Sequence, residues 1–120
     1  MKTKTDALLQ YFDEKIAFCK EKEALCLSDS REDEAKFEKI RANIYDIFRT
    51  MVNASVKISN GNEAKARAFY FGKLEQIPEN WKKAYALAEK HSDSEAMHIE
   101  SIKLETKEII RRDSEMIWED

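Results

Sequence analysis

Two ionisable residues near the start of the last helical segment have the spacing of a metal site. Glu95 and His98 form a Glu-x-x-His motif, which in di-metal bundles places both ligands on one helix. The complete site needs a second such motif, but the only histidines are His91 and His98, so a dimer would have to supply it. A metal- or small-ligand-binding bundle using Glu95, His98 and Asp113 is the alternative hypothesis. We favour a capping Glu95, a solvated His98 and no bound cofactor.

Asp113 is the other titratable group in an unusual place. It falls on the apolar stripe of the last segment, with Ile102, Ile109 and Met116. A carboxylate on such a face could be buried with a raised pKa; we favour a salt bridge to a Lys or Arg of a neighbouring helix, or fraying near the terminus. No Gly-rich phosphate loop, Cys-x-x-Cys or nucleophile–base constellation is evident, so we expect the protein not to be an enzyme.

The composition excludes several classes of protein. Apolar residues make up 42% and charged residues 38% of the 120 residues, which is too apolar for a disordered chain. Gly occurs twice and Pro once, too few for the turns of a β-rich fold. The net charge of −3 lacks the basic excess of a nucleic-acid binder. The sequence predicts one domain, residues 1–120, built from few, long elements.

The N-terminus and the cysteines indicate a cytoplasmic protein. No apolar signal segment follows Met1, and no run of about 18 apolar residues could span a membrane. Cys19 and Cys26 are seven residues apart, which on a helix separates them by about 10 Å along the axis, too far for a disulfide. We therefore expect two buried, reduced thiols.

Apolar periodicity predicts four long helices, at about residues 6–27, 31–59, 63–90 and 93–117. The clearest seam lies in the second, at Phe37, Ile40, Ile44, Ile47, Met51, Ala54 and Ile58. Short loops force antiparallel neighbours, so we predict an all-α, antiparallel up-down-up-down four-helix bundle with the third helix kinked at Pro78. The expected core residues are Phe12, Ile16, Ile40, Ile44, Ile47, Met51, Leu74, Ile77, Trp81, Ile102 and Ile109.

The breaks between the predicted helices carry capping signals. Thr5 is a plausible N-cap, and Ser30 with Asp33 and Ser92 with Glu95 have capping-box spacing. The tripeptide Ser-Asp-Ser occurs at residues 28–30 and again 64 residues later. Two duplicated hairpins would produce this repeat, but matching beyond the tripeptide is poor. We therefore favour common capping chemistry as its explanation.

Apolar residues also occur on helix faces that the predicted core does not need. Contiguous apolar patches mark interfaces, whereas single exposed apolar residues do not. The sequence therefore predicts a non-enzymatic helical interaction module, a small adaptor, regulator or chaperone-like protein that binds a protein partner or itself as a homodimer, while nucleic acid and membrane are not expected partners. Glutamate at Phe18 or Val52 should weaken association while helicity survives; if both variants unfold, the residues are core. The interface candidates are Tyr11, Phe18, Leu25, Tyr45, Val52, Val56, Met97 and Leu104.

Overall fold

The computed structural model describes residues 2–119, and this part of the chain is 90% helical and contains no strand. The predicted all-α four-helix bundle is confirmed, and each helix boundary lies within a few residues of its predicted position. The third helix consists of two segments, α3 and α4, in direct succession. The helices are α1 (Lys4–Ser28), α2 (Glu32–Ser59), α3 (Glu63–Gln76), α4 (Pro78–Lys90) and α5 (Ser94–Glu119).

The bend at Pro78 is small, at 7°. Ile77, between α3 and α4, keeps helical dihedrals (φ −61°, ψ −44°), and its N–H still donates to the Lys73 carbonyl at 3.0 Å. Pro78 occupies the first turn of α4, where its missing N–H costs little. The predicted kink is therefore only weakly expressed, and α3 and α4 act as one long helix.

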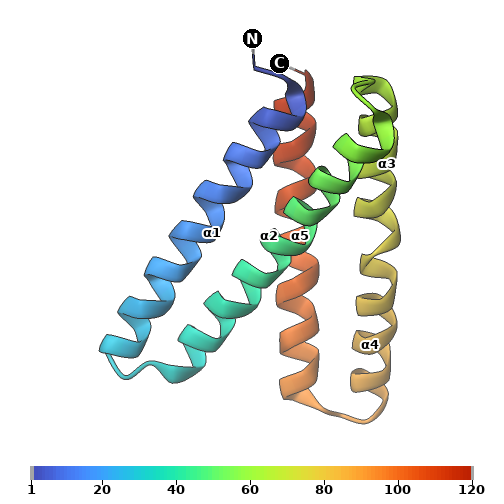
Figure 1. Cartoon of the computed structure of the whole chain (residues 1–120). Coiled ribbons are helices and arrows are strands. Elements are labelled where there is room, and N and C mark those ends of the chain that lie inside the picture. The colour runs from blue at the N-terminus through green and yellow to red at the C-terminus, as the bar shows by residue number, and fades with distance from the viewer. Residues whose placement is uncertain (1, 120) are drawn as a thin grey trace.

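The helices form two hairpins that run side by side (Figure 1). In one, α1 packs against α2; in the other, α4 packs against α5. α2 crosses α5 and also contacts α3, which gives it neighbours on several sides. The start of α1, the end of α5 and the α2–α3 turn lie at one end of the bundle, whereas the two hairpin tips lie at the other end and diverge.

The helix ends differ in detail from the predicted caps. α1 begins two residues earlier, with a capping box formed by Thr3 and Asp6 in place of an N-cap at Thr5. Ser30 and Ser92 do not cap the following helices, because both have left-handed backbones (φ 60° and 54°) that end the preceding ones. After α2, Gly61 takes a left-handed φ of 89°, a conformation that glycine allows at the end of a helix.

The buried face of α2 is rotated from the predicted seam. Ile44 is the only seam residue that is fully buried; Ile58 is 62% exposed, and the others are partly buried. The buried face includes small and polar residues, which an apolar pattern alone does not reveal. The buried residues of α2 are Ala35, Glu38, Ala42, Ile44, Tyr45, Phe48, Val52, Ser55 and Ser59.

The other predicted core residues lie in the core or against it, with one exception. Phe12, Ile16, Leu74 and Ile102 are buried. Trp81, Ile40, Ile47, Met51 and Ile77 are partly buried and pack against the core. Ile109 is a wrong prediction: it is 38% exposed, and the adjacent Ile110 takes the buried place because α5 presents that position to the core. The cysteines Cys19 and Cys26 are both buried and unpaired, as expected. Within residues 2–119, every helix is too short or too polar to cross a membrane.

Candidate functional site

The three candidate ligands of the metal hypothesis do not come together. Glu95 accepts a hydrogen bond from the Lys36 ammonium at 3.0 Å, and the exposed His98 packs its ring edge-on against Phe37, with 4.6 Å between ring centroids. Asp113 lies about 22 Å farther along α5 than His98, by the rise of an α-helix. Across residues 2–119 no group of three His, Cys, Asp or Glu side chains is placed to share a metal ion.

Asp113 is partly buried between helices, but its partner is not a base. The Tyr11 hydroxyl donates to Asp113 Oδ2 at 2.6 Å, joining α1 to α5. Burial, and then this hydrogen bond, raise the pKa of Tyr11 well above its usual value, so the hydroxyl keeps its proton. In place of the predicted salt bridge, the neutral Tyr11 hydroxyl donates a hydrogen bond to the Asp113 carboxylate.

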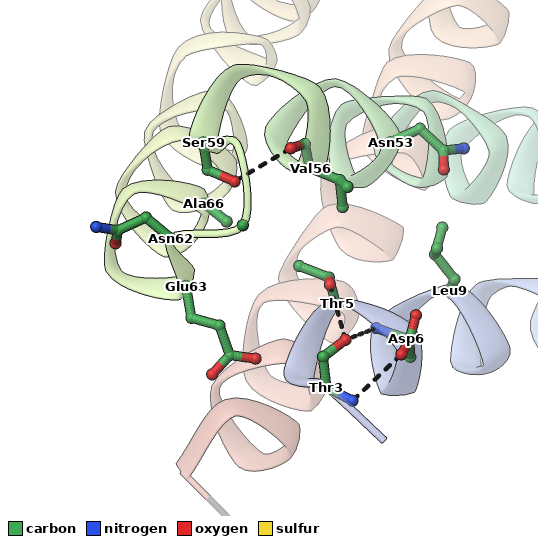
Figure 2. Close-up of a pocket in the computed structure, with 11 residues that line it drawn as sticks. Thr3, Thr5, Asp6, Leu9, Asn53, Val56, Ser59, Asn62, Glu63 and Ala66 are labelled. Atoms are coloured by element: carbon green, nitrogen blue, oxygen red, sulfur yellow. Dashed lines mark hydrogen bonds between the residues drawn. The ribbon is translucent and has the colours of Figure 1, made fainter. Parts of the chain in front are cut away.

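A pocket of about 300 Å³ lies at the end of the bundle where α1 begins and α2 turns into α3 (Figure 2). Leu9, Val56 and Ala66 supply apolar walls, and hydroxyl, amide and carboxylate groups line the rest. The polar groups hold the helix ends together. Thr3 bonds to Thr5 and Asp6, and Asn62 Oδ1 accepts the Lys65 N–H at 3.1 Å.

The carboxylates of this pocket are similarly engaged. Glu63 Oε1 accepts the backbone N–H of Lys4 at 3.0 Å, tying α3 to α1. The hydrogen bonds from Thr3 lower the pKa of Asp6, which keeps that carboxylate ionised as a cap. A nucleophile next to a base is not found among the lining residues. The pocket is a capping structure, and its groups serve the stability of the helix ends.

The interface candidates divide into buried and exposed residues. Tyr45 is 6% exposed and Val52 is fully buried, so both belong to the core and not to a surface of the chain. Met97 and Leu104 of α5 are partly buried. Val56 is exposed at the rim of the capping pocket. Phe18 and Leu25 are 57% and 58% exposed, so the two most exposed of these candidates both lie on α1.

Phe18 and Leu25 continue a row on which α1 already contacts another helix. Lys4, Tyr11, Phe18 and Leu25 follow at intervals of seven, and hence lie on one side of α1. The first two contact α5: Lys4 Nζ donates to the Ile117 carbonyl at 3.3 Å, and Tyr11 to Asp113. Phe18 and Leu25 lie farther toward the tip, where the hairpins diverge (Figure 1). We call these four residues the α1 row.

Basic side chains border the α1 row. The ammonium groups of Lys15 and Lys22 lie 5.9 Å and 5.5 Å from the ring centroids of Tyr11 and Phe18, in cation–π contact. Lys22 also pairs with Glu38 of α2 at 3.5 Å, and Arg41 pairs with the same carboxylate at 2.6 Å. The open half of the row is therefore apolar along its length and positive along one border.

Reactive chemistry is not available beside the row. Burial, and then the Glu38 carboxylate, raise the pKa of the Cys19 thiol, which keeps it protonated and unreactive. No family model, no curated protein and no solved structure matches this chain. The sequence grouped Tyr11, Phe18 and Leu25 at intervals of seven but missed that Lys4 belongs to the same row. The interval of seven can be read from the sequence, but the sequence does not show which half of the row α5 covers.

Proposed function

We propose that the protein is a cytosolic, non-enzymatic helical interaction module that binds a helix of a partner protein along the open half of the α1 row. The continuity of this row supports the proposal. Its covered half, at Lys4 and Tyr11, already takes a helix, and its open half presents two large apolar side chains in the same register. Lys15 and Lys22 would favour a partner helix with acidic residues along that edge.

The mechanism is packing of one helix face on another. Phe18 and Leu25 would supply the apolar anchors, and burial of such anchors at the centre of an interface dominates binding energy. The basic border would set the orientation of the partner through charge, which affects specificity and association rate more than affinity. Val52, once a candidate for the same role, is core and cannot contribute.

Native mass spectrometry of the protein isolated gently from its own cells tests the proposal. Wild type should carry a protein partner, and Phe18→Glu should weaken binding by about 2 kcal/mol or more, roughly 30-fold, while circular dichroism stays unchanged. Ile58→Glu is the matched control, because Ile58 is also exposed but lies on α2. Val52→Glu should unfold the chain, since it buries a charge.

Three outcomes would contradict the proposal. A partner that stays bound to Phe18→Glu, or that Ile58→Glu releases equally, would place the interface elsewhere. A wild-type chain that carries a metal ion or a small ligand and no protein would favour a ligand-binding bundle instead. Unfolding of Phe18→Glu would show that Phe18 supports the fold itself.

A further inference from the structure

The turns at the two hairpin tips have the same pattern of backbone hydrogen bonds. Ser30 and Ser92, 62 residues apart, both have left-handed backbones. The helices before them end at Ser28 and Lys90, and those after them begin at Glu32 and Ser94, again 62 residues apart. The backbone bonds, given as matching pairs, are Asp29 N to Leu25 O and His91 N to Leu87 O, Ser30 N to Leu27 O and Ser92 N to Glu89 O, and Arg31 N to Cys26 O and Asp93 N to Ala88 O.

The same offset relates side chains along both arms of the hairpins. The ion pair of Glu38 with Arg41 on α2 matches that of Glu100 with Lys103 on α5. Buried positions also coincide: Leu8 with Tyr70, Phe12 with Leu74, Ile16 with Pro78, Cys26 with Ala88, Ile44 with Thr106, Phe48 with Ile110 and Val52 with Ser114. Identical residues at this offset are Lys20/Lys82, Ala24/Ala86, Leu25/Leu87, Ser30/Ser92, Glu38/Glu100, Ile40/Ile102, Ile47/Ile109 and Arg49/Arg111.

Capping chemistry alone does not explain this agreement. It can repeat a turn, but it does not keep one register along the helices on both sides of that turn. The Ser-Asp-Ser tripeptides, offset by 64 residues, are not the equivalent positions; the backbone sets the offset at 62. The repeat is therefore in the structure, and the tripeptide is incidental to it.

At one site, the contact between the two hairpins has the arrangement expected when two copies of the same surface bind each other. In a two-fold contact, if one residue touches a second, their counterparts touch in reverse. Lys36 of α2 pairs with Glu95 of α5, and their counterparts at the 62-residue offset are His98 and Asp33. All four line one pocket between the two hairpins, which is the arrangement that a local two-fold axis would give.

We infer that the chain is one helical hairpin present twice, and that the surface by which each half holds the other fits a second copy of this chain. Within residues 2–119, a three-residue linker, 60–62, joins the two halves. The linker reverses the direction of the chain because Asn60 (φ 49°) and Gly61 (φ 89°) have left-handed backbones. If this reversal is lost, α2 and α3 continue as one helix, and each half binds the opposite half of another chain. This surface does not include Phe18 and Leu25, so the inference does not rest on the proposed function.

Replacing the linker tests the inference in the full chain. In the variant Asn60→Ala/Gly61→Ala/Asn62→Ala, the left-handed positions become costly and the Asn62 cap is lost, while an alanine Cβ at position 61 meets no atom within 4 Å. Native mass spectrometry should find a dimer with unchanged helical circular dichroism. The single variant Asn60→Gly keeps the reversal, is the matched control, and should stay monomeric.

Zero-length cross-linking then identifies the halves in contact. Lys36 and Glu95 are 3.0 Å apart and at least half exposed, so a carbodiimide should join them. The link should lie within one chain in the control and between chains in the triple variant, which would give a covalent dimer on a denaturing gel. A triple variant that stays monomeric, loses its helix, or dimerises with the link still inside each chain would overturn the inference.

Discussion

At the scale of the residue, three tyrosines join the helices through their hydroxyls and ring edges. Tyr11 donates to Asp113, and the hydroxyls of Tyr70 and Ser114 share a hydrogen bond of 2.7 Å. Tyr45 packs edge-on against Phe12, with ring centroids 6.3 Å apart. A buried tyrosine needs a partner for its polar end while its ring fills the core, and α5 supplies partners to two of the three.

These tyrosines predict a loss of stability in alkali. Burial raises the pKa of Tyr45 to about 12 and also raises that of Tyr70, above the usual value of 10.0. The unfolded chain then releases these protons at lower pH than the folded chain, so stability is intact below pH 10 and falls as the pH rises toward 12. Urea unfolding across this range measures the loss, and tyrosinate absorbance measures the titration. Ordinary tyrosine titration in a chain that stays folded would contradict it.

At the scale of the element, α2 shows how a helix can carry a convincing apolar seam and bury another face. Phe48 and Val52 are fully buried, whereas Ile58, the last residue of the predicted seam, is mostly exposed. α2 contacts α1, α3 and α5, so it has neighbours on several sides. Several apolar stripes were therefore compatible with a central helix, and the neighbours selected among them.

Truncation at two α2 positions tests this assignment. Phe48→Ala should lower the free energy of unfolding by about 3–5 kcal/mol, because it leaves a cavity in the core. Ile58→Ala should change it by no more than about 0.5 kcal/mol, as expected of an exposed side chain. Chemical denaturation of both variants gives the comparison. Similar losses in the free energy of unfolding at the two positions would indicate that the predicted seam is the buried face of α2.

At the scale of the whole molecule, the two hairpins have equivalent positions, but a buried glutamate is paired more completely in the first hairpin than in the second. Glu38 pairs with Arg41 and also with Lys22 across its hairpin. Its counterpart Glu100 pairs only with Lys103, and its Oε2 is buried without a hydrogen-bond partner among the described residues. The counterpart of Lys22 is Ala84, which cannot provide the missing cation. The second hairpin thus lacks a contact that the first one has.

Supplying that cation should stabilise the protein. Ala84→Lys should raise the free energy of unfolding by about 0.2–1 kcal/mol, the usual range for a partly exposed ion pair. Ala86→Lys, on the exposed side of the same helix, is the control and should have no effect. Adding Glu100→Gln should abolish the gain, and a double-mutant cycle on chemical denaturation would isolate the pair. A gain that persists in the Glu100→Gln background would show that the lysine acts through other groups.

Much of the architecture could be read from local sequence. Periodicity and backbone preferences predict the number of helices, the helix boundaries within a few residues and the stop at Gly61. Both act over a few neighbouring residues. The same holds for Phe12 and Leu74, because each lies on an apolar stripe that helical periodicity reveals. These features needed no knowledge of which helix packs on which.

Tertiary structure alone decided the rest. Periodicity orders side chains around one helix but does not say which arc faces a neighbour, so Phe18 and Val52 were equivalent candidates until packing exposed one and buried the other. Likewise, the partner of Asp113 depended on α1 crossing α5 at Tyr11. The open end of the α1 row exists because the hairpins diverge, and that angle is set by contacts between residues far apart in the chain.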